Sequence, residues 1–382
     1  MQIKFISTKF DQKGGGSNRS LGLLADRLAE DHEVEILTFQ PDMNHLVDPP
    51  VPVQEYPSSS WLNTLQNCVR VLSELEEETD IYHIFSPVLI PAAGLYRKWG
   101  DTPVIGRLNS YSLFCTNPSI IDSECYKNCT LMNKISHDDS PIKRKPKRLH
   151  KYIFKQSALS ISSSVDQFFA QSPSVKEIYA DAGLSAPITV VPNFYDPDFP
   201  AGSSRRPQNR EQILYVGRLT KEKGVDLLLD SFHRLNDRGA KLTIVGDGPQ
   251  RSLLEKKVTE LPISDQVEFR GWVSYNQLGQ VYAQSSVFVH PGLWPEPFGN
   301  TTLEAMQHQL PIIVSNTGGP PWIAKGAAIT FEPGSVQELT HAISHLDESK
   351  RDQLARRCSE RIDRFSPKKV VNTVENEYRK VI

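Results

Sequence analysis

Residues 286–306 read SVFVHPGLWPEPFGNTTLEAM, and this stretch decides the fold of the second half of the chain. The apolar run that ends at Pro291 predicts a buried strand, and the residues from Gly299 onward predict a helix. Glu296 lies in the loop between them, and Glu304 lies in the helix. Because ligands of open α/β sheets bind outside the carboxyl ends of the strands, both carboxylates are candidates for a ligand site.

The start of this helix is a candidate phosphate site. Backbone N–H groups of Phe298, Gly299 and Asn300 lie at the positive end of the helix, where a diphosphate is favoured. The alternative is a capped surface helix that carries two solvated glutamates.

A second motif, VGRLTKEKG, spans residues 216–224. Arg218 and Lys223 follow a predicted strand and precede a predicted helix. A guanidinium matches phosphate oxygens with its planar fork, and an ammonium supplies a point charge. Together they are candidates for neutralising a leaving nucleoside diphosphate without a metal. The alternative is a solvated basic turn.

A third motif, KGGGSN, follows the first predicted strand at residues 13–18. Gly15 and Gly16 allow a ligand to approach the backbone closely. The motif lacks the last glycine of a dinucleotide fingerprint, where Arg19 stands, and it lacks the Gly-Lys-Ser/Thr of a P-loop. The alternative is a flexible loop before an ordinary capped helix.

The rest of the chain alternates short apolar runs with helical stretches, which is typical of parallel sheets with crossover helices. Strands are predicted at 3–8, 33–39, 81–85, 104–108, 158–162 and 188–192, and then at 213–217, 241–246, 267–271, 286–291, 311–315 and 327–331. Helices are predicted at 18–30, 62–78, 165–181, 225–237 and 299–309. Residues 41–57 and 109–150 are interpreted as loops or irregular inserts.

The predicted fold is therefore α/β with two facing Rossmann-like domains and a cleft between them. We expect a first domain at 1–195, a proline-rich linker at 196–211 and a second domain at 212–365. A C-terminal helix at 366–382 is a candidate to cross back to the first domain.

The composition of the chain limits the classes of partner and the cellular compartment that we expect. The 382 residues have a formal net charge of −2, which gives no overall basic field for nucleic acid. The N-terminus lacks the long apolar stretch and cleavage site of a signal peptide, so we expect a cytoplasmic protein. Five cysteines, an odd number spread along the chain, argue against a disulfide framework.

Taken together, the three motifs resemble glycosyltransferase family 4, the retaining GT-B glycosyltransferases also called glycosyl transferases group 1. VGRLTKEKG, LTIVGDGP, VEFRGWV, HPGLWPEPFGNTTLEAM and PIIVSNTGG follow in the order and spacing of that family. The segment VVPNFYDPDF is similar to the family's Pro-Asn-Gly-Val-Asp segment.

The resemblance implies that the domain at 1–195 is the acceptor-side domain and that the domain at 212–365 binds the nucleotide-sugar, and it implies roles for the matched positions. Glu296 would hold hydroxyls of the donor sugar near the reacting carbon, and Glu304 would bind the ribose hydroxyls. Arg218 and Lys223 would bind the diphosphate and stabilise its charge as the bond breaks. Further donor contacts are implied at Gly15, Gly16, Asn300, Thr301 and Thr302.

Two positions depart from the family pattern. Asn109 stands where the family often has a histidine near the acceptor, and an amide cannot accept a proton as imidazole can. Trp322 replaces the glutamate of the Gly-Gly-x-x-Glu segment. Both changes bear on the acceptor and on the identity of the sugar.

The predicted function is retaining transfer of a hexose-type sugar from a UDP- or GDP-sugar to a hydroxyl of a glycan or lipid-linked acceptor, with no metal and no further cofactor. One alternative is a sugar-nucleotide epimerase of the same architecture. Another is a non-catalytic nucleotide-sugar-binding protein, which the departures at Asn109 and Trp322 would suit.

Three remaining features have a preferred interpretation. Asp196 and Asp198 match an Asp-x-Asp metal motif but lie in the predicted linker. His83 ends a predicted strand, and a core histidine is favoured over a cleft-facing one. Cys115, Cys125 and Cys129 cluster in the insert, where buried thiols are favoured over a zinc site because the spacing is unlike common zinc knuckles.

Segment 143–155, which begins at Lys143 and ends at Lys155, mixes seven cations with four apolar residues. Contact with anionic lipid at the inner face of the membrane and a solvated basic loop before an amphipathic helix are equally favoured.

Overall fold

The computed structural model describes residues 1–10, 16–39, 49–115, 126–127, 130–136, 149–200 and 212–382. The chain divides into two compact units. Unit 1 comprises Met1–Phe194 and Pro367–Ile382, and unit 2 comprises Tyr195–Ser366.

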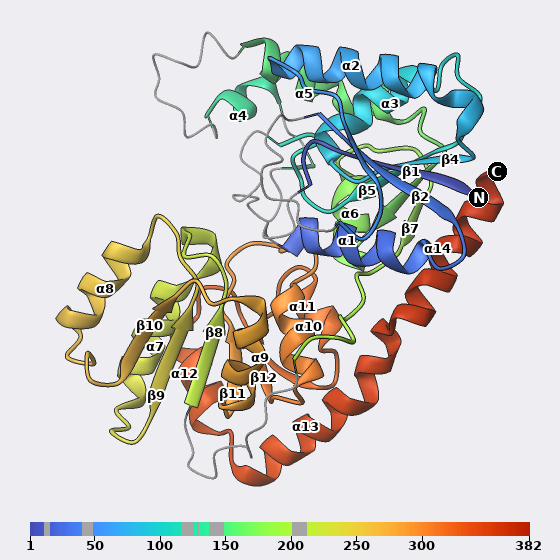
Figure 1. Ribbon diagram of the computed structural model, residues 1–382. Helices are drawn as coiled ribbons and strands as arrows, with labels where there is room; N and C mark the ends of the chain where they lie inside the picture. Colours follow the sequence, from blue (N-terminus) through green and yellow to red (C-terminus); the bar gives the residue numbers. More distant parts are fainter. Residues whose placement is uncertain (11–15, 40–48, 116–125, 128–129, 137–148, 201–211) are drawn as a thin grey trace. The chain divides into compact units, whose positions relative to one another are not determined.

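Unit 1 is built on a parallel sheet of order β3-β2-β1-β4-β5-β6-β7 (Figure 1). Its central strands are apolar on both faces, as expected for a sheet that helices cover on both sides. The strands are β1 (Gln2–Ser7), β2 (Glu33–Thr38), β3 (Val53–Glu55), β4 (Ile81–Ile84), β5 (Val104–Leu108), β6 (Gln167–Ala170) and β7 (Ile188–Val190).

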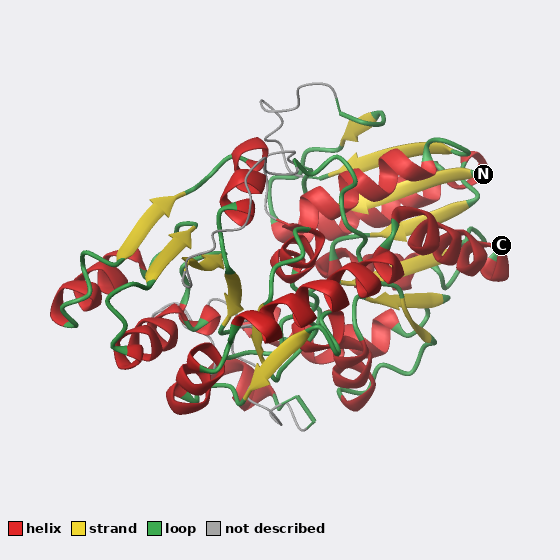
Figure 2. Ribbon diagram, turned by 90° about the horizontal axis from the view of Figure 1, so that it is seen from below, coloured by secondary structure: helices red, strands yellow, loops and turns green. Residues whose placement is uncertain are grey.

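Helices lie on both sides of the strands (Figure 2). The core on one face joins α1 and α14, which reaches it through Val370, Val374 and Tyr378. The helices of unit 1 are α1 (Gly16–Leu28), α2 (Trp61–Glu74), α3 (Ile90–Tyr96), α4 (Leu131–Ser136), α5 (Leu149–Ser162), α6 (Pro173–Asp181) and α14 (Pro367–Val381), with short 3-10 turns η1 (Glu76–Glu78) and η2 (Pro87–Leu89).

The sequence prediction for residues 158–172 was wrong, whereas α6 confirms the second half of the helix predicted at 165–181. The predicted strand 158–162 is the last part of α5, and the sixth strand, β6, lies inside the predicted helix 165–181. α5 is helical because it packs on α3: a Cβ atom on Gly94 would lie only 2.4 Å from the carbonyl oxygen of Ile161. β6 reads QFFA and is fully buried. Four residues are too few for the periodicity to distinguish a strand from a helical turn.

Two of the predicted irregular segments contain regular structure. Residues 53–55 of the expected loop 41–57 form β3, which pairs with β2 at the edge of the sheet. Within the expected insert 109–150, α4 occupies Leu131–Ser136 and α5 begins at Leu149.

Unit 2 contains a second parallel sheet, of order β10-β9-β8-β11-β12-β13. All six strands predicted for this half are present, with ends that differ by at most one residue. They are β8 (Gln212–Val216), β9 (Lys241–Val245), β10 (Val267–Gly271), β11 (Val287–His290), β12 (Ile312–Ser315) and β13 (Ala328–Phe331).

Two hydrophobic cores cover the faces of this sheet. One gathers residues from the strands with α9 (Tyr275–Ala283), α10 (Asn300–Gln307), α11 (Pro320–Ile323) and α13 (Glu348–Ile362). The other gathers them with α7 (Val225–Leu235), α8 (Arg251–Glu260) and α12 (Val336–Ser344). The 3-10 turns η5 (Lys221–Lys223) and η6 (Asp363–Phe365) complete the unit.

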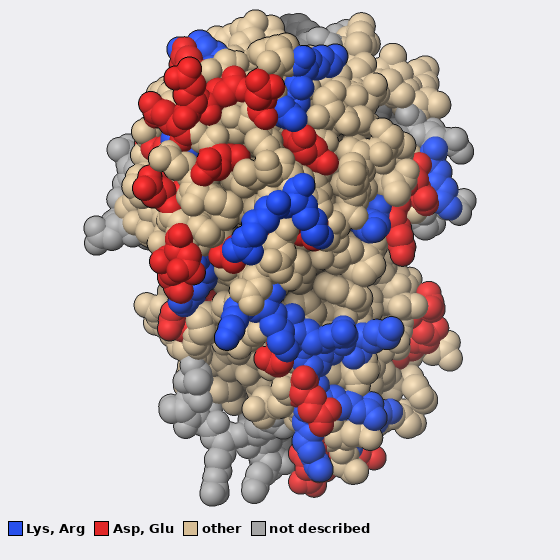
Figure 3. Space-filling model, turned by 90° about the vertical axis from the view of Figure 1, so that its right-hand side faces the viewer, with Lys and Arg blue, Asp and Glu red and all other residues tan. Residues whose placement is uncertain are grey.

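The surface carries both signs of charge. Lys and Arg side chains and Asp and Glu side chains both lie on the face shown in Figure 3. In the described parts of the chain, no helix combines the length and the apolar character that crossing a bilayer requires.

The close packing of α3 on α5 gives a test of unit 1. We expect Gly94→Ala to lower the free energy of unfolding by about 1–3 kcal/mol, because the new methyl group would overlap a backbone carbonyl that cannot rotate away. Gly22→Ala is the matched control, since its methyl group would meet only the tip of the Phe10 ring, at 3.3 Å. Thermal and urea unfolding measure the free energy of unfolding of the two variants. Equal values for Gly94→Ala and Gly22→Ala would contradict the close packing of α3 on α5.

Candidate active site

The carboxylate of Glu296 is the centre of the candidate site in unit 2. Lys223 in η5, which follows β8, places its Nζ 2.6 Å from Glu296 Oε2. His290, the last residue of β11, places its Nε2 2.8 Å from the same oxygen. β8 and β11 are neighbours in the sheet, so the loops that follow them meet at its carboxyl edge.

The charges around Glu296 favour its ionised form. Burial opposes ionisation, but the charge of Lys223 and the interaction with His290 outweigh it and hold the pKa of Glu296 well below its usual range. A carboxylate this acidic is a weak proton acceptor at neutral pH. The site therefore suits electrostatic stabilisation rather than general-base chemistry.

Glycines allow three loops to converge on Glu296. Gly224 has φ 67°, and a Cβ there would lie 2.0 Å from the carbonyl oxygen of Pro291. A Cβ on Gly318 would lie 2.5 Å from both the backbone N and O of Glu296. The N–H of Gly319 donates to the carbonyl oxygen of Glu296 at 2.7 Å. The backbone of Glu296 is thus held as firmly as its side chain.

The helix that follows this loop begins at a left-handed glycine. Gly299 has φ 103° and directly precedes α10, whose first residues Asn300, Thr301 and Thr302 are the predicted donor contacts. Phe298 packs its ring into the hydrophobic core, so its backbone alone is a candidate for ligand contact. The hydroxyl of Thr302 is buried and has no hydrogen-bond partner among the described residues.

The second carboxylate of the motif has a separate anchor. Tyr282 in α9 is fully buried and donates from its hydroxyl to Glu304 Oε2 at 2.8 Å. Burial first, and then the charge of Glu304, raise the pKa of Tyr282 well above its usual range. The hydroxyl therefore stays protonated and acts as a donor to Glu304.

The remaining predicted residues of unit 2 lie in two settings. Arg218 follows β8 with an exposed side chain, so it is accessible to an anion. Trp322, in the position of the family's glutamate, lies in α11 and packs edge-on against Phe365 at 5.5 Å. Trp322 is thus part of the packing of unit 2, where a glutamate would present a carboxylate.

In unit 1 the predicted residues lie at the carboxyl end of the central strands. Asn109 follows β5 and donates from Nδ2 to the hydroxyl of Ser17 at 3.1 Å and to the carbonyl oxygen of Phe85 at 2.8 Å. Gly16 begins α1, and Gly15 lies outside the described residues. The structure therefore brings Asn109 next to the start of α1.

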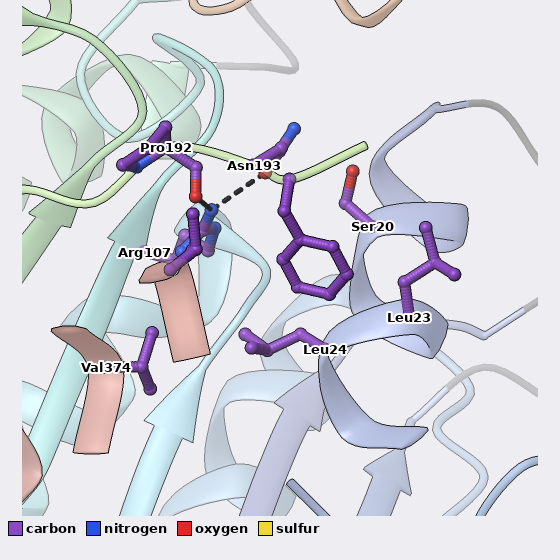
Figure 4. Close-up of a pocket in the computed structure, with 9 residues that line it drawn as sticks. Ser20, Leu23, Leu24, Arg107, Pro192, Asn193 and Val374 are labelled. Atoms are coloured by element: carbon purple, nitrogen blue, oxygen red, sulfur yellow. Dashed lines mark hydrogen bonds between the residues drawn. The ribbon is translucent and has the colours of Figure 1, made fainter. Parts of the chain in front are cut away.

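A buried arginine lies two residues before Asn109. Arg107 donates to Asn193 Oδ1 at 2.8 Å, beside a cavity that Ser20, Asn193 and Val374 help to line (Figure 4). The cavity holds about 10 Å³, room for a single water and far too little for a sugar. We interpret Arg107 as a structural clamp on the last residues of unit 1 before the chain enters unit 2.

Three preferred interpretations can be compared with the structure. His83 is buried, its Nδ1 lies 2.7 Å from the hydroxyl of Tyr378, and the core interpretation is confirmed. Asp196 accepts a hydrogen bond from the backbone N–H of Asp198 at 3.0 Å, a local turn contact. Cys115 is buried, whereas Cys125 and Cys129 lie outside the described residues. Among the residues that the structure describes, no three His, Cys, Asp or Glu side chains are placed to hold a metal ion.

The basic segment is described only in part. Lys143 and its neighbours up to residue 148 lie outside the described residues. Lys155 directs its Nζ to the carbonyl oxygens of Ser112 and Cys115, so its charge is engaged within unit 1.

Sequence reasoning missed two polar residues that hold the carboxylates. His290 ends an apolar strand at the carboxyl edge, and that position was a usable signal. Tyr282 lies in a different helix from Glu304, and nothing in its surroundings in the sequence indicates the contact.

The comparisons with known proteins agree with this architecture. Residues 14–199 match the profile described as Glycosyltransferase Family 4, and residues 200–365 match the profile described as Glycosyl transferases group 1. An uncharacterized glycosyltransferase, MJ1607, of Methanocaldococcus jannaschii is 38% identical over 112 residues, which are 29% of this chain and 28% of that protein. The lipopolysaccharide core biosynthesis glycosyltransferase LpsE of Rhizobium meliloti is 28% identical over 210 residues, which are 53% of this chain and 60% of LpsE.

The matched regions thus span less than two thirds of either relative. Among solved structures, Anabaena HepE in complex with UDP superposes with a TM-score of 0.76 at 18% identity, over 100% of both chains. The predicted fold class, α/β with two Rossmann-like domains of the GT-B type, is confirmed. The chain belongs to glycosyltransferase family 4, with its second half in glycosyl transferases group 1.

Proposed function

We propose that the protein transfers a hexose-type sugar, with retention of configuration, from a UDP- or GDP-sugar to a hydroxyl of a glycan or lipid-linked acceptor. The observation that carries this proposal is the contact of Lys223 and His290 with one oxygen of Glu296 at the carboxyl edge of the unit 2 sheet. Cations and a firmly held carboxylate at this edge suit a substrate that combines a diphosphate with a sugar.

Retention is proposed from the resemblance to the retaining family. An inverting transferase needs a base that takes the acceptor proton on the face opposite the leaving group, and Glu296 is too acidic to be that base. In front-face transfer the bond between the anomeric carbon and the phosphate oxygen breaks, and its electron pair stays on the diphosphate. The acceptor oxygen bonds to the same face, and its proton passes to the leaving phosphate.

Each residue then has a role in the proposed reaction. Lys223 and Arg218 would neutralise the diphosphate as its charge grows, and Glu296 would hold sugar hydroxyls beside the reacting carbon. Glu304, oriented by Tyr282, would accept hydrogen bonds from the ribose hydroxyls. Gly16 and Asn109, the latter able to hydrogen-bond a hydroxyl, remain candidates from unit 1. No step in this scheme calls for a metal or a further cofactor.

A lipid-linked acceptor is supported by an apolar surface on unit 1, which we define as Leu62, Met132, Leu149 and Ile153. Their exposed fractions are 57%, 73%, 46% and 52%. The helices that carry these residues pack together, because Trp61 of α2 lies edge-on against Phe154 of α5, at 4.7 Å, and α4 contacts α5. Five Lys and Arg residues precede Leu149 in the sequence, at positions 143–148. Apolar side chains next to cations are typical of proteins that rest on anionic lipid.

Binding of the donor is the first test. We expect one of UDP, GDP or ADP, or one of their common sugars, to raise the Tm of the wild-type protein, and Glu304→Ala to weaken that binding by about tenfold or more because hydrogen bonds to a charged group are lost. Glu260→Ala, which removes an exposed carboxylate of α8, is the matched control. Well-folded protein that no nucleotide stabilises would contradict the proposal, and formation of an epimer from the donor alone would favour the isomerase alternative.

The role of Lys223 is tested by turnover. We expect Lys223→Ala to lower kcat by about 100-fold or more, because a charge that stabilises the leaving diphosphate is lost. Lys221→Ala removes an exposed lysine of the same 3-10 turn and should leave kcat nearly unchanged. Release of nucleoside diphosphate from the donor measures kcat of the two variants. The anomeric proton coupling of the product reports its configuration. Equal rates in the two variants, or an inverted product, would contradict the proposal.

Membrane contact is tested with the double variant Leu149→Ser/Ile153→Ser. We expect it to bind phosphatidylglycerol-rich vesicles about tenfold more weakly than the wild type, because apolar area no longer enters the bilayer interface. Leu253→Ser, which removes a leucine of similar exposure from unit 2, is the control. Cosedimentation measures the binding, and failure of the wild type to bind such vesicles more than phosphatidylcholine vesicles would argue for a solvated surface.

A further inference from the structure

Both donors to Glu296 use the same carboxylate oxygen. Lys223 Nζ and His290 Nε2 lie 2.6 Å and 2.8 Å from Oε2. In the described part of the chain, no side-chain contact of Glu296 falls on Oε1. One oxygen is thus held by the protein, and the other is available to a sugar hydroxyl.

The two donors differ in their freedom to move. The ammonium of Lys223 ends a four-carbon stem and also lies 5.8 Å from the centre of the Trp294 ring. A lysine that turns toward a diphosphate, as the proposed function requires, releases Oε2 of Glu296. His290 has a short side chain on the last residue of a buried strand and is 4% exposed, so it cannot follow.

The ring of His290 is held in place by its surroundings. A Cβ on Gly292 would lie 2.9 Å from its Cε1 and 3.3 Å from its Nδ1, so only glycine leaves room for this ring position. The same point lies 3.8 Å from the hydroxyl oxygen of Ser315. Neither His290 Nδ1 nor this hydroxyl has a hydrogen-bond partner among the described residues, and both are buried. A hydrogen bond from a water to His290 Nδ1 would favour the tautomer with the proton on Nε2, which is the donor that Glu296 accepts from.

We propose that His290 is a positioning residue that keeps the carboxylate of Glu296 in one orientation, with Oε1 directed to the donor sugar, after Lys223 has turned to the diphosphate. This inference rests on the proposed function for its catalytic part. The arrangement of His290 and Glu296 itself can be measured without any ligand.

Other groups around Glu296 bear on its titration. Tyr215 in β8 is fully buried; burial and then the charges of Glu296 and Glu222 raise its pKa well above its usual range. It therefore stays neutral while Glu296 titrates. The titrating and charged groups near Glu296 are then Lys223 and His290.

The experiment compares His290→Phe, which removes the donor, with His290→Gln, which keeps an N–H donor on a side chain of similar length. His233→Phe, at an exposed histidine of α7, is the control. The ligand-free measurement is the ¹³C-detected pH titration of the Glu296 carboxyl group, assigned by its absence in Glu296→Gln. Removing a hydrogen-bond donor to the carboxylate should move this titration to higher pH in His290→Phe, less so in His290→Gln, and not at all in the control.

The second measurement is donor hydrolysis and binding, with UDP-glucose and GDP-mannose as substrates and UDP and GDP as ligands. We expect kcat to fall about 10- to 100-fold in His290→Phe, as for a misplaced reacting group, while the Kd for the nucleoside diphosphate stays within about twofold. His290→Gln should recover most of the loss. In His290→Phe the acid limb of the kcat profile should move to higher pH, because activity is lost as Glu296 becomes protonated.

Failure of the two proposals can be told apart. Wild-type protein that binds no nucleotide would overturn the proposed function, while the carboxyl titration would still decide the His290 arrangement. Turnover by His290→Phe at the wild-type rate, or an unchanged Glu296 titration, would overturn the role of His290. A parallel loss of nucleotide binding in both variants, without recovery in His290→Gln, would assign His290 to folding alone and would also overturn it.

Discussion

The shared hydrogen-bonded oxygen of Glu296 imposes the main constraint on unit 2. It requires the loops after β8, β11 and β12 to meet at one edge, which the parallel strand order β8-β11-β12 supplies. It also requires the loop backbones to touch, which residues larger than glycine at 224 and 318 would prevent. An ionised carboxylate can be buried here because the ammonium of Lys223 and the imidazole of His290 contact it directly.

Much of unit 2 could be predicted because its strands are short apolar runs bounded by Gly, Pro or charged residues. In unit 1, the secondary structure between residues 158 and 170 was harder to predict from the sequence. The segment ALSIS alternates like a strand, yet it continues a helix whose packing depends on Gly94, more than sixty residues earlier. The true strand, QFFA, carries no local pattern that a helix turn would not also show. Tertiary packing decided both.

In the candidate site, too, local motifs allowed some residues to be predicted, whereas tertiary contacts placed others. Glu296, Lys223 and Glu304 were predicted because each lies in a motif with ligand-binding chemistry. Their partners were not predicted, since the contacts of His290 and Tyr282 arise from strand order and from helix packing. The roles of these residues in a reaction are predictions, and the structure shows the contacts that position their side chains. The role of Trp322 also follows from a tertiary contact, because its ring packs against Phe365, which lies in a different helix.

The division of unit 1 between the two ends of the chain has a consequence for biosynthesis. Its core needs Val370, Val374 and Tyr378 of α14, which leave the ribosome after all of unit 2. The first 194 residues must therefore wait, with one apolar face uncovered, while the whole of unit 2 is translated and can fold. A stalled or truncated chain that lacks the last sixteen residues would expose this face, and quality-control factors that recognise apolar surface could select against it.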